Sequence, residues 1–215
     1  GVDDTICSGS GTSIGGVTTA SGGTPPYTYA WNQAASLNDS TLSNPTASPT
    51  STKTYVVTVT DSNGCTASDS IIVYVDALPT AANAGPDQAL CNATTTSLSG
   101  NAPGVGTGNW LVIAGSSTVT TPSSPTSGVT GLTVGSSGTL TWTISNGLCP
   151  VSVDTVIISS QIPAVANAGS NDTICEVSNI TLSGSIGGSA ISGTWNTSGD
   201  GLFNDSSLLN ATYTP

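Results

Sequence analysis

The spacing of the cysteines divides this chain into repeats. The five cysteines are Cys7, Cys65, Cys91, Cys149 and Cys175. The first, third and fifth of them are 84 positions apart, and the second and fourth each follow the preceding cysteine by 58 positions. The same period relates two copies of Ala-Asn-Ala-Gly, at 82–85 and 166–169. A fixed period of this size predicts a tandem array of small domains, each of which contacts its neighbours.

The period also places the boundaries between the units. We expect three domains, at residues 1–77, 78–161 and 162–215. Pro79 and Pro163 occupy the same place in the two connections, where they restrict the backbone. Short connections that contain proline favour a stiff arrangement, so we expect the domains to lie end to end in an elongated rod.

The composition excludes several classes of function. Charged residues make up 6 % of the chain, against roughly 25 % in an average soluble protein, and the chain has one Lys, no Arg and no His. Few groups are therefore present that act as general bases near neutral pH, and we expect no enzyme activity and no required cofactor. The net charge of −11 with a single cationic side chain argues against binding to nucleic acid or anionic lipid.

The apolar residues follow the period of β-strands. Apolar side chains alternate with polar ones, mainly threonine, in the runs 54–60, 70–75 and 139–145. Turn residues interrupt the chain every eight to twelve positions, and no segment has the apolar spacing of a helix. Many short strands at this spacing predict an all-β fold of β-sandwich domains. No apolar run is long enough to span a bilayer, so we expect any membrane anchor to lie outside this sequence.

Each complete unit is expected to close with a hairpin that carries its second cysteine. Asn63-Gly64 and Asn146-Gly147 supply the turns, and a cysteine follows each of them closely. If the first and last strands of a unit both begin at its N-proximal pole, its two cysteines meet there. We therefore expect the disulfides Cys7–Cys65 and Cys91–Cys149, with Cys175 paired near position 233, beyond this sequence.

Regularly paired cysteines place the protein in an oxidising, extracellular compartment. Closing a loop of this size stabilises a domain by about 4 kcal/mol in the chain-entropy model. The alternative is that the cysteines are free, buried thiols.

Three segments of the first unit resemble the PKD-type domain of Bacteroidetes surface proteins, and these segments are 20–31, 44–49 and 58–65. The later units resemble the Ig-like repeats of giant gliding-motility adhesins, through their Ala-Asn-Ala-Gly openings and through 108–110 and 193–195. The resemblance implies PKD-like and Ig-like sandwiches, type IX secretion, attachment to the bacterial cell surface and a role as a stalk or adhesive filament. One departure is that Asn32-Gln33-Ala34 follows Trp31, where the PKD pattern often has a Phe-Gly-Asp-Gly loop.

The resemblance also implies O-glycosylation. Asp followed by Ser or Thr and then by an apolar residue or Thr is similar to the glycosylation sequence of that phylum. The candidate acceptors are Thr5, Ser40, Ser70, Thr155 and Thr173. The alternative is that these aspartates solvate the ends of strands.

Acidic residues near the unit openings suggest a second kind of site. Carboxylate oxygens suit Ca²⁺, which would stiffen a junction between domains. The candidate ligands are Asp3, Asp4, Asp76 and Asp87. The third unit has Asn171 in the place of Asp3 and Asp87, and no EF-hand spacing is present. We interpret the single lysine, Lys53, as a charge at a strand edge rather than as a partner in an isopeptide bond.

The tryptophans separate two functional interpretations. Trp110, Trp142 and Trp195 fit the cores of sandwiches, whereas Trp31, near Tyr27 and Tyr29, is the one most suited to a surface. We therefore expect a structural and adhesive repeat segment of a large surface adhesin, with its own neighbouring repeats, surface polysaccharide or other cells as partners. The alternative is an array of carbohydrate-binding modules in a secreted enzyme that degrades polysaccharides.

Overall fold

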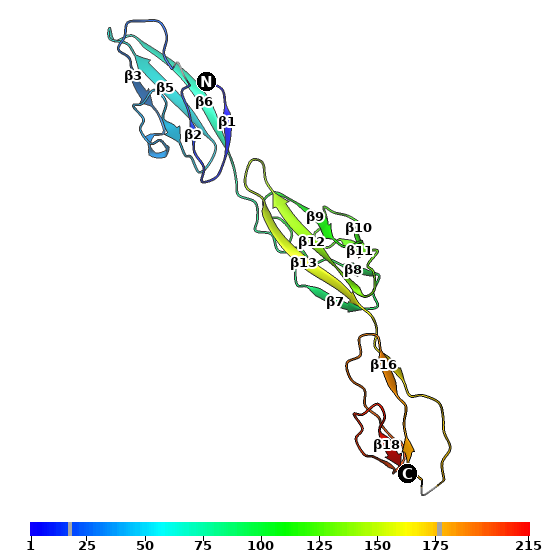
Figure 1. Ribbon diagram of the computed structural model, residues 1–215. Coiled ribbons are helices and arrows are strands. Elements are labelled where there is room, and N and C mark those ends of the chain that lie inside the picture. The colour runs from blue at the N-terminus through cyan, green and yellow to red at the C-terminus, as the bar shows by residue number, and fades with distance from the viewer. Residues whose placement is uncertain (17–18, 176–177) are drawn as a thin grey trace.

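The computed structural model describes residues 1–16, 19–175 and 178–215, and it arranges three β-rich units end to end as a rod (Figure 1). Within these ranges, the regular structure consists of strands and one short 3-10 turn, η1 at Ala34–Ser36. The all-β architecture predicted from the alternating runs is confirmed. In the part of the chain that is described, no helix is long and apolar enough to cross a membrane.

The first unit packs a four-stranded sheet against a two-stranded one. The sheets have the strand orders β1-β6-β5-β3 and β2-β4. Their bounds are β1 Asp4–Cys7, β2 Thr12–Ser13, β3 Thr28–Trp31, β4 Thr46–Ala47, β5 Lys53–Thr60 and β6 Thr66–Asp76. β5 and β6 form an antiparallel hairpin around Asn63-Gly64, as predicted. β1 pairs with β6 in parallel, and this pairing places Cys7 opposite Asp76.

The second unit repeats this plan. Its sheets have the orders β7-β13-β12-β9 and β10-β11-β8. Their bounds are β7 Gln88–Cys91, β8 Thr95–Ser97, β9 Thr107–Ala114, β10 Thr118–Val119, β11 Gly128–Thr130, β12 Ser136–Ser145 and β13 Ser152–Gln161. The first strand, β7, again pairs in parallel with the last, β13, and Cys91 lies opposite Gln161.

The third unit contains shorter strands. Its sheets are β14-β16 and β15-β18-β17. Their bounds are β14 Val165–Asn167, β15 Ile180–Thr181, β16 Ser185–Gly187, β17 Leu202–Phe203 and β18 Thr212–Thr214. Phe203 and Tyr213 pack across β17 and β18 with their ring centroids 5.2 Å apart. Trp195 is half-buried and donates its indole N–H to the carbonyl of Leu208 over 3.0 Å.

The first two units each have a separate hydrophobic core. In the first unit, Tyr55 and Val57 of β5 lie on the same buried face of the sheet as Ile71 and Val73 of β6, and Trp31 is also buried. The alternation predicted for these strands is therefore confirmed, but Trp31 does not line a surface. Its indole N–H donates to the carbonyl of Leu42 over 2.9 Å, which satisfies the polar atom of a buried ring.

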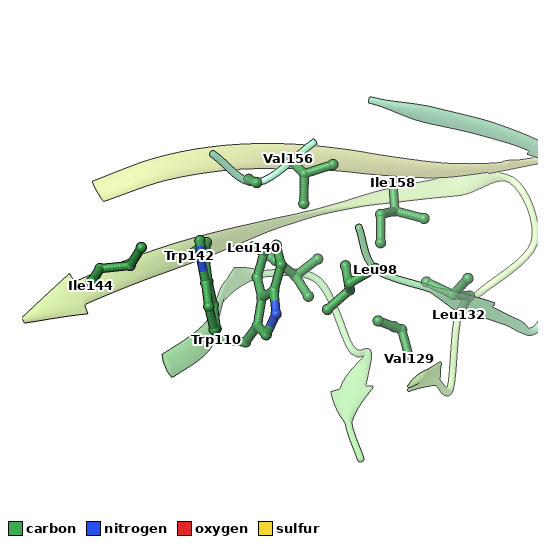
Figure 2. Packing of buried hydrophobic residues seen from close by; sticks show 10 residues of the cluster. Leu98, Trp110, Val129, Leu132, Leu140, Trp142, Ile144, Val156 and Ile158 are labelled. Carbon is green, nitrogen blue, oxygen red and sulfur yellow. The ribbon is translucent and has the colours of Figure 1, made fainter. Parts of the chain in front are cut away.

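Two tryptophans packed against each other form the centre of the second core (Figure 2). Leu140, Trp142 and Ile144 point inward from β12, and Trp110 reaches them from the neighbouring strand β9. The ring centroids of Trp110 and Trp142 are 5.0 Å apart with a tilt of 35° between the planes. Gly108, on β9, lies under the ring of Trp142, so the absence of a side chain there makes room for the indole.

We predict that Gly108→Ala destabilises the second unit. A Cβ atom at this position would lie 2.2 Å from Cζ2 of Trp142, so the ring or the strand must move. Overpacking of this kind lowers the free energy of unfolding by about 1–3 kcal/mol. Guanidinium unfolding followed by tryptophan fluorescence measures the change. Gly104→Ala is the control, because its Cβ would have no neighbour closer than 3.6 Å. Equal stability of the two variants would contradict this account of the core.

Candidate functional site: the junction between the first two units

Strand direction brings three chain segments together where the first two units meet. β1 and β6 both run toward the second unit, so Cys7 and Asp76 lie at the far pole of the first. β13 runs away from the first unit, parallel to β7, and the turn before it therefore points back (Figure 1). The junction thus consists of the end of β1, the end of β6 and the turn between β12 and β13.

A disulfide joins the two units across this junction. Cys7 is bonded to Cys149, with 4.8 Å between their Cα atoms and 142 positions between them in sequence. Both side chains are buried, with 5 % and 6 % of their surfaces exposed. The two units are therefore connected twice, once by the backbone and once through sulfur. We call this bond the interdomain staple.

The predicted pairs Cys7–Cys65 and Cys91–Cys149 are wrong. Cys7 ends its strand rather than beginning it, and the parallel pairing of β1 with β6 places it at the opposite pole from the hairpin that carries Cys65. Cys91 and Cys149 are separated in the same way within the second unit. In the described structure Cys65, Cys91 and Cys175 are free and exposed. The pairing of Cys175 with a residue beyond this sequence remains a prediction.

Asp76 binds the turn of the second unit beside the staple. Its Oδ2 accepts a hydrogen bond from the N–H of Leu148 over 3.0 Å. Its backbone carbonyl accepts the N–H of Ser8 over 2.8 Å, which fixes the residue after Cys7. The side-chain amide of Asn146 donates to the carbonyl of Ala77 over 2.7 Å. Two hydrogen bonds thus cross between the units next to the covalent bond, in addition to the one that anchors the first unit's own strand.

The turn requires glycine at position 147 for two reasons. Gly147 has a φ of +49°, a region that favours glycine. A Cβ atom there would also lie 1.8 Å from Oδ2 of Asp76. The Asn-Gly pair that predicted a hairpin in sequence therefore also makes room for a carboxylate from the preceding domain.

The connection between the units is fixed to the second unit by hydrogen bonds. The hydroxyl of Thr80 accepts the N–H groups of Gly104 and Val105, over 2.9 and 2.8 Å. Farther along, the N–H of Ala82 donates to the hydroxyl of Ser152 and the N–H of Ala84 to Oδ2 of Asp154, each over 2.8 Å. The connection therefore lies along the second unit as an ordered strap and does not act as a free tether.

The acidic residues considered for Ca²⁺ are held separately. Asp3 accepts the N–H of Ile72 and Asp87 accepts that of Ile157, both over 2.8 Å. These are equivalent contacts, in which the residue before the first strand fixes the last strand, and they explain why the two aspartates share a repeat position. Asp4 accepts the N–H of Thr5 over 2.8 Å, while Asp76 binds the turn. Among the described residues, no three carboxylate, imidazole or thiol groups gather as a metal site would require.

The candidate glycosylation sites differ in their accessibility. Ser70, Thr155 and Thr173 are exposed, whereas Thr5 and Ser40 are half-buried. Ser70 and Thr155 lie on the last strands β6 and β13, and Thr173 precedes β15. Glycosylation at these positions stays a prediction.

Lys53 begins β5 and donates to the side-chain oxygen of Gln33 over 3.3 Å. This contact is with a glutamine, whereas an isopeptide bond to the lysine would require an Asn side chain nearby.

The sequence does contain a signal for the staple. Cys7 and Cys91 each directly follow an apolar residue, Ile6 or Leu90, at the end of a short strand. A cysteine at the end of a first strand lies at the C-proximal pole whenever that strand is parallel to the last one. The sequence does not show whether the first strand is parallel or antiparallel to the last strand, so this signal alone does not place the cysteine.

Comparison with known proteins identifies the fold. No family model matches the chain, and no curated protein matches its sequence. Among solved structures, the chain is similar to titin domains I67–I69 in an E-to-A mutated variant, with a TM-score of 0.56 and 11 % identity over 99 % of this chain and 85 % of that one. It is also similar to the I-band fragment I67–I69 of titin, with a TM-score of 0.53 and 11 % identity over 99 % and 83 % of the two chains. The fold is therefore that of tandem Ig-like domains.

We predict that Asp76→Ala exposes the staple to reduction. Loss of the carboxylate leaves the N–H of Leu148 without its acceptor and loosens the turn that carries Cys149. The rate of thiol–disulfide exchange depends on access to the sulfur atoms, so we expect reduction by dithiothreitol to become severalfold faster. Timed alkylation and mass spectrometry measure the rate. Asp200→Ala in the third unit is the control, and equal rates in the two variants would show that Asp76 does not protect the bond.

We also predict that Asp154→Asn makes the free energy of unfolding less dependent on pH in the acidic range. The hydrogen bonds from the N–H groups of Ala84 and then Thr155 lower the pKa of Asp154 below its ordinary value of 3.8. The ionised form therefore stabilises the folded state above about pH 4, and this contribution is lost as pH falls through the lowered folded pKa. Asn keeps an acceptor oxygen but does not titrate. Unfolding free energies at pH 5 and pH 2.5 should differ less in this variant than in the wild-type chain or in Asp200→Asn.

Proposed function

We propose that this chain is a force-transmitting spacer in an extracellular surface adhesin. Its Ig-like units at residues 1–77, 78–161 and 162–215 would act as rigid segments that hold an adhesive part of the protein away from its anchor. The observation that carries this proposal is the interdomain staple. A disulfide within one domain stabilises that domain, whereas a disulfide between successive domains fixes the geometry of the array.

The staple changes the path along which tension travels. A force applied to the two ends of the chain passes from Cys7 directly to Cys149 and bypasses the 142 positions between them. The cores of the first two units lie almost wholly in this bypassed segment. Tension therefore cannot extend that segment while the bond is intact. Asp76, Asn146 and the strap from Thr80 to Ala84 keep the same junction ordered in the absence of force.

Several features support an extracellular location. A buried disulfide persists in an oxidising compartment and is rare in the cytosol. The resemblance of 20–31 and 58–65 to PKD-type domains suggests a Bacteroidetes surface protein exported by the type IX system. A stapled rod suits a gliding-motility adhesin, which must transmit force between a cell and a surface. Its partners in this proposal are neighbouring repeats, surface polysaccharide and other cells.

The structure does not favour the alternative of carbohydrate-binding modules. A tryptophan that stacks on a sugar must expose a face of its ring to solvent. Trp31, Trp110 and Trp142 are buried here, with 7 % or less of their surfaces exposed. A non-enzymatic role also agrees with the lack of His and Arg in the sequence. O-glycosylation at Ser70, Thr155 and Thr173 would add to the proposal by protecting exposed strands.

Single-molecule stretching tests the force-transmitting function. The full chain is held at its two ends and unfolded completely, first oxidised and then with dithiothreitol. We expect the oxidised chain to reach a contour length about 500 Å shorter, because 142 positions at about 3.6 Å each are excluded from extension. Cys7→Ser should give the longer length under both conditions. Cys65→Ser is the matched control and should behave as the wild-type chain does.

Two results would overturn the proposal. Equal contour lengths in the oxidised and reduced chains would show that no staple lies in the path of tension. A compact, side-by-side particle in small-angle X-ray scattering of the oxidised chain would show that the units do not form a rod.

A further inference from the structure

We propose that Cys65 and Cys91 are half-staples, each of which forms a disulfide with another unit of this repeat type joined end to end. Cys91 would bond to the hairpin cysteine of the unit that follows, and Cys65 to the first-strand cysteine of a unit that precedes. The inference rests on the proposed spacer function and extends it, because it makes the staple a property of every junction.

Cys91 has the same setting as the bonded Cys7. Each residue ends the first strand of its unit, and each is paired in parallel with the last residue of the last strand, Asp76 or Gln161. The following N–H donates to the carbonyl of that last residue in both units, over 2.8 Å from Ser8 and 2.9 Å from Asn92. The thiol of Cys91 is therefore held at the C-proximal pole of the second unit, where the next unit begins, and it is exposed.

Cys65 has a setting that matches the bonded Cys149. Both lie in the turn before the last strand of a unit, directly after or close to an Asn-Gly pair, and at the N-proximal pole. Each turn is closed by a backbone hydrogen bond of 3.0 Å to the carbonyl three positions back, from the N–H of Gly64 to Asp61 and from the N–H of Cys149 to Asn146. Cys65 is exposed at this pole, so a preceding unit can reach its sulfur.

The two half-staples are also chemically compatible with each other. In the observed staple, the preceding unit supplies the Asp76 carboxylate to an N–H of the turn. The second unit has Gln161 in that place, which offers no carboxylate. The turn that carries Cys65 does not need one, because its own Asp61 accepts the N–H groups of Asn63 and Cys65, each over 2.9 Å. A unit ending in Gln161 can therefore pair with a turn of this kind without leaving an N–H group of the turn with no acceptor.

The bond forms by ordinary thiol–disulfide exchange with a disulfide oxidant. One thiolate attacks the oxidant to give a mixed disulfide and release a thiol. The second cysteine then displaces the other half of the oxidant as a second thiol. With oxidised glutathione, two protein thiols become one disulfide and two molecules of reduced glutathione are released, which balances electrons and protons.

The consequence for mechanics follows from the positions of the cysteines. In an array with every junction stapled, tension passes from Cys7 to Cys149 through the disulfide. It then follows the backbone for 26 positions to Cys175, which would be bonded to a later unit. This segment extends to about 90 Å at about 3.6 Å per residue. The two folded sandwiches that this segment spans have a similar combined length, because each is about 35–40 Å long. Such an array cannot lengthen much under load even if its domains lose their folds.

A tandem chain tests the pairing directly. It consists of residues 1–168 followed by residues 1–161, joined so that Ala168 precedes Gly1 as it normally precedes Gly169. Each of its four units has its own buried core in the structure. The protein is refolded with a glutathione redox buffer, free thiols are alkylated, and peptides from a non-reducing digest are mapped by mass spectrometry. We expect Cys91 of the first copy to be bonded to Cys65 of the second.

The controls use the same substitution at two places. Cys91→Ser in the first copy should remove the new bond, whereas Cys91→Ser in the second copy, which has no following unit, should leave it intact. We expect two free thiols among the eight cysteines of the tandem chain, and four free thiols would overturn the inference. If Cys7–Cys149 forms but Cys91 stays free, the inference fails while the spacer proposal stands. If Cys7–Cys149 is also absent, both fail.

Discussion

The parallel pairing of the first strand with the last strand fixes where the cysteines of each unit lie. It occurs in both complete units, as β1 with β6 and as β7 with β13. Two parallel strands end at the same pole, so the cysteine that ends the first strand lies beside the residue that enters the connection. The hairpin cysteine lies at the other pole. Neither can reach its partner within the unit, and both face the junctions.

In this arrangement the disulfide has a different structural role from the disulfide of an immunoglobulin domain. The immunoglobulin disulfide crosses the core between the two sheets. Here the cores of the first two units contain no disulfide among their described residues, and aliphatic and aromatic side chains fill them. The sulfur bond stabilises the relation between two domains. The Asp76 carboxylate and the strap from Thr80 to Ala84 reinforce that relation without covalent chemistry.

The low charge of the chain fits this role. With one Lys and no Arg, side-chain salt bridges contribute little to these domains, and aspartates instead accept backbone N–H groups. Asp3 and Asp87 fix the last strands, Asp61 closes a turn, and Asp154 holds the connection. The aspartates at the openings of the first two units share a repeat position, and this repetition suggested Ca²⁺ ligands. The reason for the repetition is the capping of strands within each unit.

The repeat period and the strands follow from the amino-acid sequence alone. Alternation in 54–60 and 139–145 is a local property, and it specified which side chains enter each core because successive residues of a strand face opposite sides. Which cysteines meet depends on the three-dimensional arrangement of the strands. Equal spacing of Cys7 with Cys65 and of Cys91 with Cys149 fits pairing within units and pairing between units equally well. Only the direction in which β1 and β7 lie against the last strands separates the two, and strand direction depends on contacts about 70 residues apart that no local pattern encodes.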